Sequence, residues 1–296
     1  MIISASRRTD IPCYYSDWFF DRIKEGYCLV RNPFNSHQVS KIDLSADVVD
    51  CIVFWTKDVS PMIDKLYLLK SYKYYFQFTI NSYGEDIENV ISKRKEKIIY
   101  SFKELSEKIG KEKVLWRYDP IILSDKYSID YHKKHFEYLI KELHNYTQKC
   151  IISFVDIYKK IENKIKDINI KKDDDSIFEL SSFISDIAKY YNITVEACCE
   201  DLPNIGKSKC IDESLISKIV GYNIKAKKDK NQRLNCGCVE SIDIGAYNTC
   251  LSDCIYCYAN NKNNIKNSSV FLEQYKQLSD LDIITERKCY SLKDNL

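Results

Sequence analysis

Cys51-Ile52-Val53-Phe54-Trp55 is an apolar run rich in β-branched and aromatic residues, and the polar residues Thr56-Lys57-Asp58 follow it directly. Such a run is typical of a strand buried in a sheet, with the polar residues marking the place where the strand ends. Similar runs occupy residues 2–6, 74–80, 113–116, 150–155, 193–197 and 239–244. The sequence therefore predicts seven strands.

Helical patterns with start and stop signals lie between these runs. They cover residues 16–25, 61–70, 86–109, 130–146, 175–191 and 212–220, and Gly110 and Gly221 follow two of them as C-terminal caps. Strands that alternate with helices predict an α/β fold around a parallel sheet. A partial or complete (β/α) TIM-like barrel is the expected architecture, with a cysteine-rich motif in its C-terminal segment.

Three stretches interrupt this alternation. Residues 26–45 are expected to form an irregular insertion or a small hairpin, residues 161–175 a solvated connection rich in Lys and Asp, and residues 225–233 an exposed basic linker. We expect two parts: a barrel body over residues 1–224, and a segment over 225–296 that holds the linker, the last barrel strand and the cysteine motif.

The composition excludes several classes of protein. The chain of 296 residues carries 45 Lys and Arg against 43 Asp and Glu, a formal charge of +2, so its balance does not indicate a dedicated nucleic-acid or membrane-surface protein. No apolar run reaches the length of about 18 residues that a membrane span needs, and the start lacks a secretory leader pattern. We expect a cytoplasmic protein without membrane contact.

The thirteen cysteines are unevenly distributed. Five are scattered and are expected to be small buried side chains: Cys13, Cys28, Cys51, Cys150 and Cys289. The others crowd into one C-terminal stretch: Cys198, Cys199, Cys210, Cys236, Cys238, Cys250, Cys254 and Cys257. In a reducing compartment, clustered thiols more often bind metal than form disulfides.

Cys250-Leu251-Ser252-Asp253-Cys254-Ile255-Tyr256-Cys257 has the spacing C-x3-C-x2-C, which allows one short loop to wrap a metal cluster. Cysteine thiolates are the usual ligands of iron–sulfur clusters, and a four-iron cluster held by three of them keeps one iron open for another ligand. Zinc is the competing prediction, but zinc sites more often repeat C-x2-C pairs. The triplet therefore favours a 4Fe-4S cluster.

The motif resembles the signature of the radical S-adenosylmethionine superfamily, with Tyr256 at its aromatic place, and Tyr258-Ala259 resembles the spore photoproduct lyase branch. In that superfamily the signature follows the first strand of a (β/α) barrel near the amino end. Here residues 239–244 supply a strand before it, late in the chain. A circular permutation that places this last strand beside the first strand would reconcile the two orders.

The whole chain also resembles an uncharacterised prokaryotic family, domain of unknown function 1848. The matching stretches are residues 3–12, Val53-Phe54-Trp55-Thr56-Lys57, Trp116-Arg117-Tyr118-Asp119-Pro120, and residues 229–238 and 257–260. The resemblance implies an architecture and a cluster without a known reaction.

Cys198, Cys210, Cys236 and Cys238 are candidate ligands of a second metal site, with Cys199 as the substitute for Cys198. Period-2 alternation places Ile193, Val195 and Ala197 on one face of a strand and Cys198 on the other. A second iron–sulfur cluster, a structural zinc and unliganded thiols are all open. The histidines show no matching spacing, and those at 132, 135 and 144 are expected on a solvated helix face.

Polar residues follow the predicted strands, and in a parallel sheet the carboxyl ends of strands share one rim where ligands bind. If the cluster takes S-adenosylmethionine, basic rim residues are expected to bind the cofactor's carboxylate or a phosphate: Arg7, Arg8, Lys57 and Arg117. Asp10 and Asp119 are candidates for amine or ribose contacts, and Cys13 for donating a hydrogen atom to a substrate radical. The reaction would involve an unknown substrate and a reducing protein such as a ferredoxin or flavodoxin.

Two other functions fit parts of the sequence. An electron-transfer or redox-sensing protein would keep the clusters without S-adenosylmethionine. A nucleic-acid repair or modification protein would use the basic residues 225–233 and the neighbouring tyrosines Tyr72, Tyr74 and Tyr75 to contact phosphates and bases.

Overall fold

A single parallel sheet forms the centre of the computed structural model, which describes residues 1–35 and 37–260. Its spatial order is β10 (Ile242–Asp243), β1 (Ile2–Ala5), β4 (Cys51–Thr56), β5 (Tyr74–Thr79), β6 (Val114–Ile121), β7 (Lys149–Phe154), β8 (Thr194–Ala197) and β9 (Gly206–Lys207). Every neighbouring pair runs parallel. The predicted α/β class is confirmed, and each of the seven predicted strands is present.

The sheet is open within the described residues. β10 forms one edge and β9 the other, and no pairing joins the two. Each edge strand is only two residues long, which leaves little backbone for a closing ladder. A complete barrel is therefore not observed, and the partial barrel stays a prediction.

The helices are α1 (Ile11–Tyr14), α2 (Ser16–Glu25), α3 (Ser60–Ile63), α4 (Lys95–Ile109), α5 (Ile129–Leu143), α6 (Lys159–Ile165), α7 (Asp174–Tyr190) and α8 (Glu213–Val220). Short 3-10 turns complete them: η1 (Leu66–Leu69), η2 (Ser92–Arg94), η3 (Lys111–Lys113) and η4 (Lys166–Ile168). Asp173 and Asp212 cap α7 and α8 by accepting backbone N–H bonds, and Gly26 and Gly221 end α2 and α8 with left-handed φ angles of 79° and 86°.

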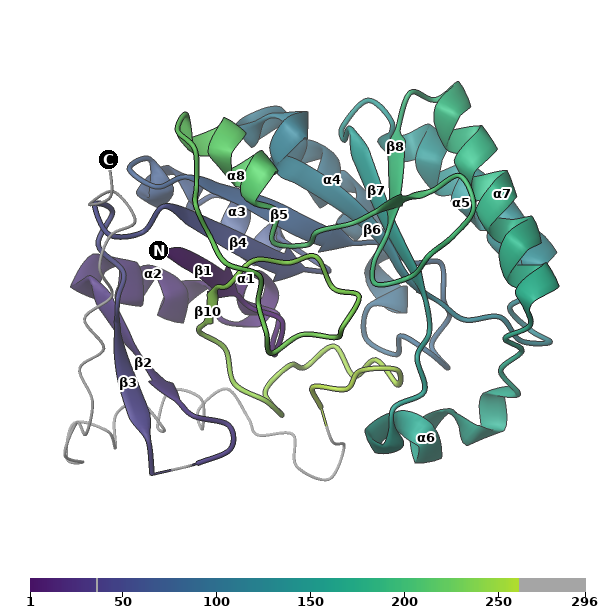
Figure 1. Cartoon of the computed structure of the whole chain (residues 1–296), viewed down its shortest axis with the longest axis horizontal. Coiled ribbons are helices and arrows are strands. Elements are labelled where there is room, and N and C mark those ends of the chain that lie inside the picture. The colour runs from purple at the N-terminus through teal and green to yellow at the C-terminus, as the bar shows by residue number, and fades with distance from the viewer. Residues whose placement is uncertain (36, 261–296) are drawn as a thin grey trace.

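Alternation along the strands gives the sheet two different faces. Ile52 and Phe54 of β4 pack into the core under the helices, whereas Cys51 and Val53 point to the opposite face. The chain that follows β8 covers that second face and crosses in front of the sheet in Figure 1. Cys198 packs on the second face, as the alternation in β8 predicts.

Residues 26–45 form the predicted small hairpin, in which β2 (Tyr27–Arg31) pairs antiparallel with β3 (Val39–Asp43). The expected helix over 61–70 is split between α3 and η1. The expected helix over 86–109 begins only at Lys95, because Glu88 instead bridges to the cysteine motif. The expected solvated connection over 161–175 is wrong in part, since α6 and η4 lie there and Ile161 and Ile165 are buried.

Some predictions extend beyond the described residues. Cys289 and residues 261–296 of the expected C-terminal segment lie outside them, so the division at residues 224 and 225 stays a prediction. Of the scattered cysteines, Cys13, Cys28, Cys51 and Cys150 are buried as predicted. Across residues 1–35 and 37–260, no helix combines the length and apolar character needed to cross a membrane.

Candidate functional site

The cysteine motif lies over the carboxyl ends of the central strands. Ile255 donates its backbone N–H to the Ile87 carbonyl at 3.1 Å, and Cys254 forms an isolated bridge with Glu88. The Tyr15 hydroxyl donates to the Thr249 carbonyl at 2.5 Å. In Figure 1 the loop runs along the lower side, between the β2–β3 hairpin and α6. Segments far apart in the sequence thus enclose the motif.

Hydrogen bonds within the motif loop and to α6 also fix its turn. The Asn260 amide donates to the Cys250 carbonyl at 2.5 Å, and Cys257 donates its backbone N–H to the Cys254 carbonyl at 3.1 Å. Lys164 of α6 donates to the Asn260 carbonyl at 2.6 Å. These bonds fix the backbone between the first and last motif cysteines, so the three thiols are presented from one ordered turn.

The three motif thiols interact electrostatically. Burial raises the pKa of Cys254 well above its usual range, Lys57 opposes the rise, and charge on Cys250 and Cys257 adds to it. Burial likewise raises the pKa of Cys250 to about 12, with contributions from Asp10 and Cys257. Each thiolate would therefore repel the others, and a shared cation would remove that repulsion. The donor set suits an iron–sulfur cluster.

A buried ion pair supports the aromatic position of the motif. The Lys57 ammonium lies 2.7 Å from both Glu88 Oε1 and the Tyr256 hydroxyl, and Tyr256 donates to Glu88. Although burial raises the pKa of Glu88, Lys57 outweighs that effect and holds it below its usual value. Asn81 Nδ2 also approaches Glu88 at 3.3 Å. Lys57 therefore anchors the motif, a role the sequence did not reveal because Glu88 lay in a predicted helix.

Arg7 and Arg8 follow β1 and use aromatic partners. The Arg7 guanidinium lies 5.4 Å from the Trp55 ring centroid, and that of Arg8 lies 5.3 Å from the Tyr247 centroid. Arg7 is also 3.7 Å from Asp229. Its Nη2 atom is buried and has no hydrogen-bond partner among the described residues. Arg7 therefore retains a donor for an anionic ligand.

The buried Arg117 pairs with the partly buried Asp119. Arg117 Nη2 donates to Asp119 Oδ2 at 2.6 Å, and Nη1 donates to Cys210 Sγ at 3.0 Å and to Gln77 Oε1 at 3.2 Å. The other Asp119 oxygen accepts from Ser153. The sequence places Arg117 at the rim, but the structure directs its guanidinium towards the second cysteine group.

Asp10 and Cys13 lie together at the start of α1. One Asp10 oxygen accepts from the Cys13 backbone N–H at 3.1 Å and the other from that of Lys57 at 2.8 Å. Burial raises the pKa of Asp10 to about 7 and that of the Cys13 thiol beyond its usual range. Asp10 thus ties α1 to the end of β4, and its expected ribose or amine contact stays a prediction.

The second cysteine group comes together as well. Cys198 Sγ lies 3.5 Å from Cys210 Sγ and 3.9 Å from Cys199 Sγ. The side chains of Cys210 and Cys238, of Cys238 and Cys236, and of Cys236 and Cys199 also lie near enough to interact. We call these five sulfurs, which contact one another in a closed circuit, the thiol ring. None of its members forms a disulfide.

Neither the motif nor the thiol ring has its side chains arranged around one metal ion. No three His, Cys, Asp or Glu side chains in the described part of the chain are already arranged to hold a metal ion. In the motif, a cluster would give each thiolate a different iron atom, which requires wider spacing than ligands of one ion. In the thiol ring there is one sulfur more than a tetrahedral ion takes.

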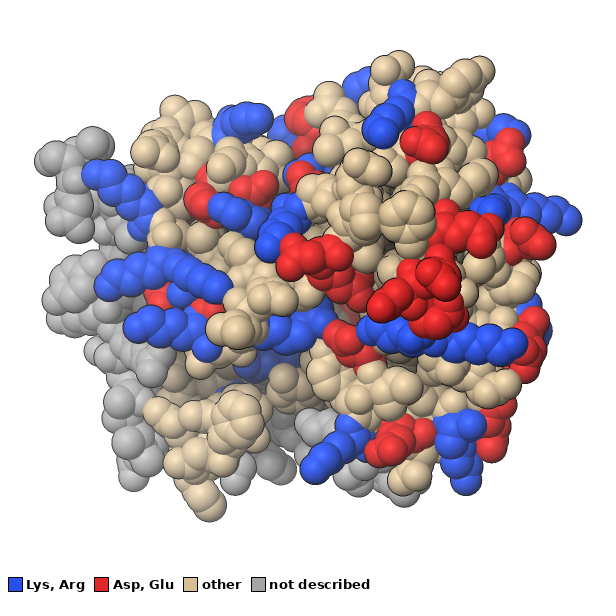
Figure 2. Space-filling view, turned by 45° about the vertical axis from the view of Figure 1, so that its right-hand side comes forward, with Lys and Arg blue, Asp and Glu red and all other residues tan. Residues whose placement is uncertain are grey.

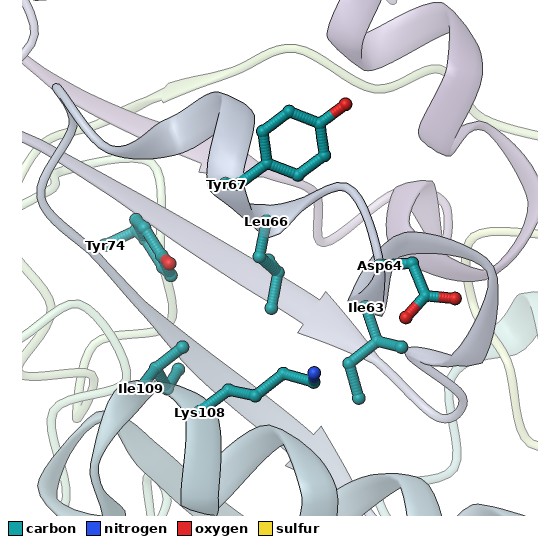
Figure 3. A pocket seen from close by; sticks show the side chains of 7 residues that line it. All are labelled: Ile63, Asp64, Leu66, Tyr67, Tyr74, Lys108 and Ile109. Atoms are coloured by element: carbon teal, nitrogen blue, oxygen red, sulfur yellow. The ribbon is translucent and has the colours of Figure 1, made fainter.

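Two surface hollows lie elsewhere. One of about 330 Å³ is bordered by α3, η1, β5 and α4, and Figure 3 shows Tyr67, Tyr74, Asp64 and Lys108 around it. It contains none of the predicted site residues. A second of about 470 Å³ lies beside Cys236 and is lined by Lys207, Lys209 and Lys228.

Comparison with known proteins gives one family. The family described as a domain of unknown function (DUF1848) matches residues 2–259. No curated protein matches the chain. Among solved structures, the chain is similar to a protein of Bacteroides thetaiotaomicron VPI-5482 provisionally described as an alpha-L-fucosidase, with 10% identity over 91% of this chain and 88% of that chain and a TM-score of 0.28. A score this low carries no argument.

Proposed function

The chain belongs to the family described as a domain of unknown function (DUF1848). Because that description gives no activity, we propose a function from the chain's own residues. We propose that it is a cytoplasmic iron–sulfur enzyme of the radical S-adenosylmethionine type, acting on an unknown substrate. Cys250, Cys254 and Cys257 would hold the 4Fe-4S cluster, and a ferredoxin or flavodoxin would supply electrons. The observation that carries this proposal is the hydrogen-bonded turn that presents the three motif thiols at the carboxyl ends of the strands.

The strand order supports the proposal. β10 leads into the motif and pairs parallel with β1, with Ile3 opposite Ile242 and Ser4 opposite Asp243. The chain that follows β10 packs closely against the chain that follows β1, because a Cβ atom on Gly245 would lie 2.1 Å from Ser6 Oγ. A last strand beside the first strand is the arrangement that a circularly permuted partial barrel would need.

The residues around the motif suit S-adenosylmethionine, which carries an amino acid carboxylate. When bound, the cluster supplies an electron for reductive cleavage of the sulfonium bond of S-adenosylmethionine. Arg7 offers its unpartnered Nη2 to the cofactor carboxylate, and the positive charge of Lys57 offsets the Cys254 thiolate. Burial keeps Cys13 protonated, as a hydrogen-atom donor must be. Arg8 and Asp119 border the same rim, while Arg117 is held by Asp119 and Cys210.

The nucleic-acid alternative gains no support from charge. Arg233 of the basic linker is paired with Asp156, so part of the linker's positive charge is already neutralised. Figure 2 shows Lys and Arg side chains interspersed with Asp and Glu on the face it presents. Such mixing is typical of an ordinary solvated surface.

The test is anaerobic reconstitution followed by reductive incubation with S-adenosylmethionine. We expect about four irons and an equal amount of acid-labile sulfide at the motif, and formation of 5′-deoxyadenosine. A Cys28→Ala variant is the matched control, because Cys28 is buried away from the motif and should leave the iron content unchanged. Absence of bound iron would refute the proposal. Bound iron without cofactor cleavage would favour the electron-transfer or redox-sensing alternative.

A further inference from the structure

One pair of sulfur atoms in the thiol ring is spaced as two ligands of a single metal ion would be. A tetrahedron with metal–sulfur bonds of about 2.3 Å has edges of about 3.8 Å between its sulfur atoms. The distance of 3.5 Å from Cys198 to Cys210 lies close to that value. A cubane would instead separate the thiolates, because each binds a different iron. The ring therefore favours a single ion.

Burial distinguishes four ligands from a fifth bystander. Cys198, Cys210, Cys236 and Cys238 are buried, whereas Cys199 is half-buried. Cys199 also has a left-handed φ of 63°, which fits a turn residue at the end of β8. If Cys199 turns away, four thiols remain, the number that structural zinc sites use.

Fixed charges and dipoles around the ring suit a tetrathiolate complex, which carries a charge of about −2 on a divalent ion. Arg117 Nη1 donates to Cys210 Sγ at 3.0 Å, and Ile211 donates its backbone N–H to Cys238 Sγ at 3.4 Å. Hydrogen bonds of this kind to ligating atoms orient and stabilise metal sites.

The ring joins segments that have little regular structure. Between β8 and β10 the described chain contains only β9 and α8, yet it covers the second face of the sheet. Cys198 follows β8, Cys210 precedes α8, and Cys236 and Cys238 precede β10. An ion at the ring would tie these segments to one another, as structural zinc does in small metal-bound folds.

We propose that Cys198, Cys210, Cys236 and Cys238 bind one tetrahedral zinc ion that stabilises the covering of the second sheet face. This site goes beyond the proposed enzymatic function and does not depend on the cluster at the motif.

The first experiment measures metals in the full chain produced with zinc and iron both supplied. A variant with Cys250→Ala, Cys254→Ala and Cys257→Ala removes the motif ligands, so any remaining metal reports on the thiol ring. We expect about one zinc and no iron per chain in this variant. Iron with acid-labile sulfide would overturn the proposal in favour of a second cluster, and absence of both metals would overturn it outright.

The second experiment identifies the ligands. Adding Cys210→Ser and Cys238→Ser to the full chain should abolish zinc retention, whereas Cys199→Ser should preserve it. Should the double variant fail to fold, cobalt titration of the metal-free chain that carries Cys250→Ala, Cys254→Ala and Cys257→Ala remains decisive, because the motif thiols then cannot contribute. The visible absorption of a tetrahedral cobalt thiolate supports the site, and its absence refutes it. Because these readouts do not involve the motif, failure of the proposed radical chemistry would leave them unchanged.

Discussion

The two cysteine groups of this protein differ in how their sulfur atoms are brought together. The motif places Cys250, Cys254 and Cys257 in one turn, where they interact electrostatically. The thiol ring collects sulfurs from three segments into direct contact, as the 3.5 Å between Cys198 and Cys210 shows. Three thiols in one turn suit a cluster with several metal atoms, and direct contact between sulfurs suits one ion. The same residue type can thus indicate two different metal sites in one chain.

The groups also differ in their counter-charges. The motif is beside Lys57, whereas the ring is beside Arg117. A substitution at one group therefore tests whether the other is independent.

The largest expected effect comes from removing the motif thiols. Replacing Cys250, Cys254 and Cys257 by Ala should eliminate the cluster iron and all cofactor cleavage, because no other thiols stand at the motif's spacing within the described residues. Metal analysis should show that zinc is retained. Loss of both metals together would show that the two groups form one site, and the contrast between them would then be wrong.

Replacing Arg117, whose guanidinium lies beside the thiol ring, should have the next largest effect. Arg117→Met removes the ion-pair partner of the partly buried Asp119 and the donor to Cys210, at a cost of about 1.5–3 kcal/mol in the free energy of unfolding. Urea unfolding measures this cost. Arg22→Met, which breaks a surface pair with Glu25, is the control and should cost under about 1 kcal/mol. Zinc should fall and iron persist in the first variant; equal losses would contradict the proposed division of roles.

Low pH should lower the stability of the aromatic packing that contacts Tyr256 of the motif. Burial lowers the pKa of His132 to about 4 from its ordinary 6.5, and its ring contacts Tyr83, which contacts Tyr256. The folded state resists protonating His132, so its contribution is complete above pH 6.5 and is lost as pH falls towards 4, by up to about 3 kcal/mol. Urea unfolding between pH 7 and 5 should show the decline.

A His132→Gln variant should flatten that pH dependence, because glutamine retains polar atoms without titrating. His135→Gln is the matched control on the same helix, where His135 is only partly buried. An unchanged slope in the His132 variant would assign the acid sensitivity to other groups.

The smallest expected effect concerns the motif tyrosine. Tyr256→Phe removes a hydroxyl bonded to Lys57 and Glu88 and should cost about 1–2 kcal/mol of unfolding free energy. Thermal and urea unfolding measure it, with the exposed Tyr190→Phe as a control that should show no change. Metal analysis should show full zinc content. A loss of zinc would mean that the two groups share a support.

The strands were the most predictable part of the fold. The buried runs that became β1, β4, β5 and β7 are apolar on both faces, so strand character is evident without knowledge of neighbours. Helix ends with strong signals, such as Gly221 after α8, were equally clear. Glu88 could not be found in this way, because its role depends on Lys57 and Tyr256 from distant segments.

His132 shows the same limit. Helical spacing placed it on a solvated face, but it is fully buried, with Tyr118 at 2.7 Å from Nδ1 and the Ile122 carbonyl 3.0 Å from Nε2. The prediction of a solvated face was wrong for His132. A polar residue can occupy a buried face when partners from other elements satisfy both ring nitrogens, and those partners are not visible in the helix itself.

The sequence alone determined the α/β class, the order of strands and helices, and the short-range spacing of Cys250, Cys254 and Cys257, because each depends on neighbours along the chain. Only the tertiary structure decided that the sheet stays open between β9 and β10, that Arg117 turns to Cys210, and that five thiols close into a ring. These features depend on the packing of residues far apart in the chain, where local pattern carries no information about distance.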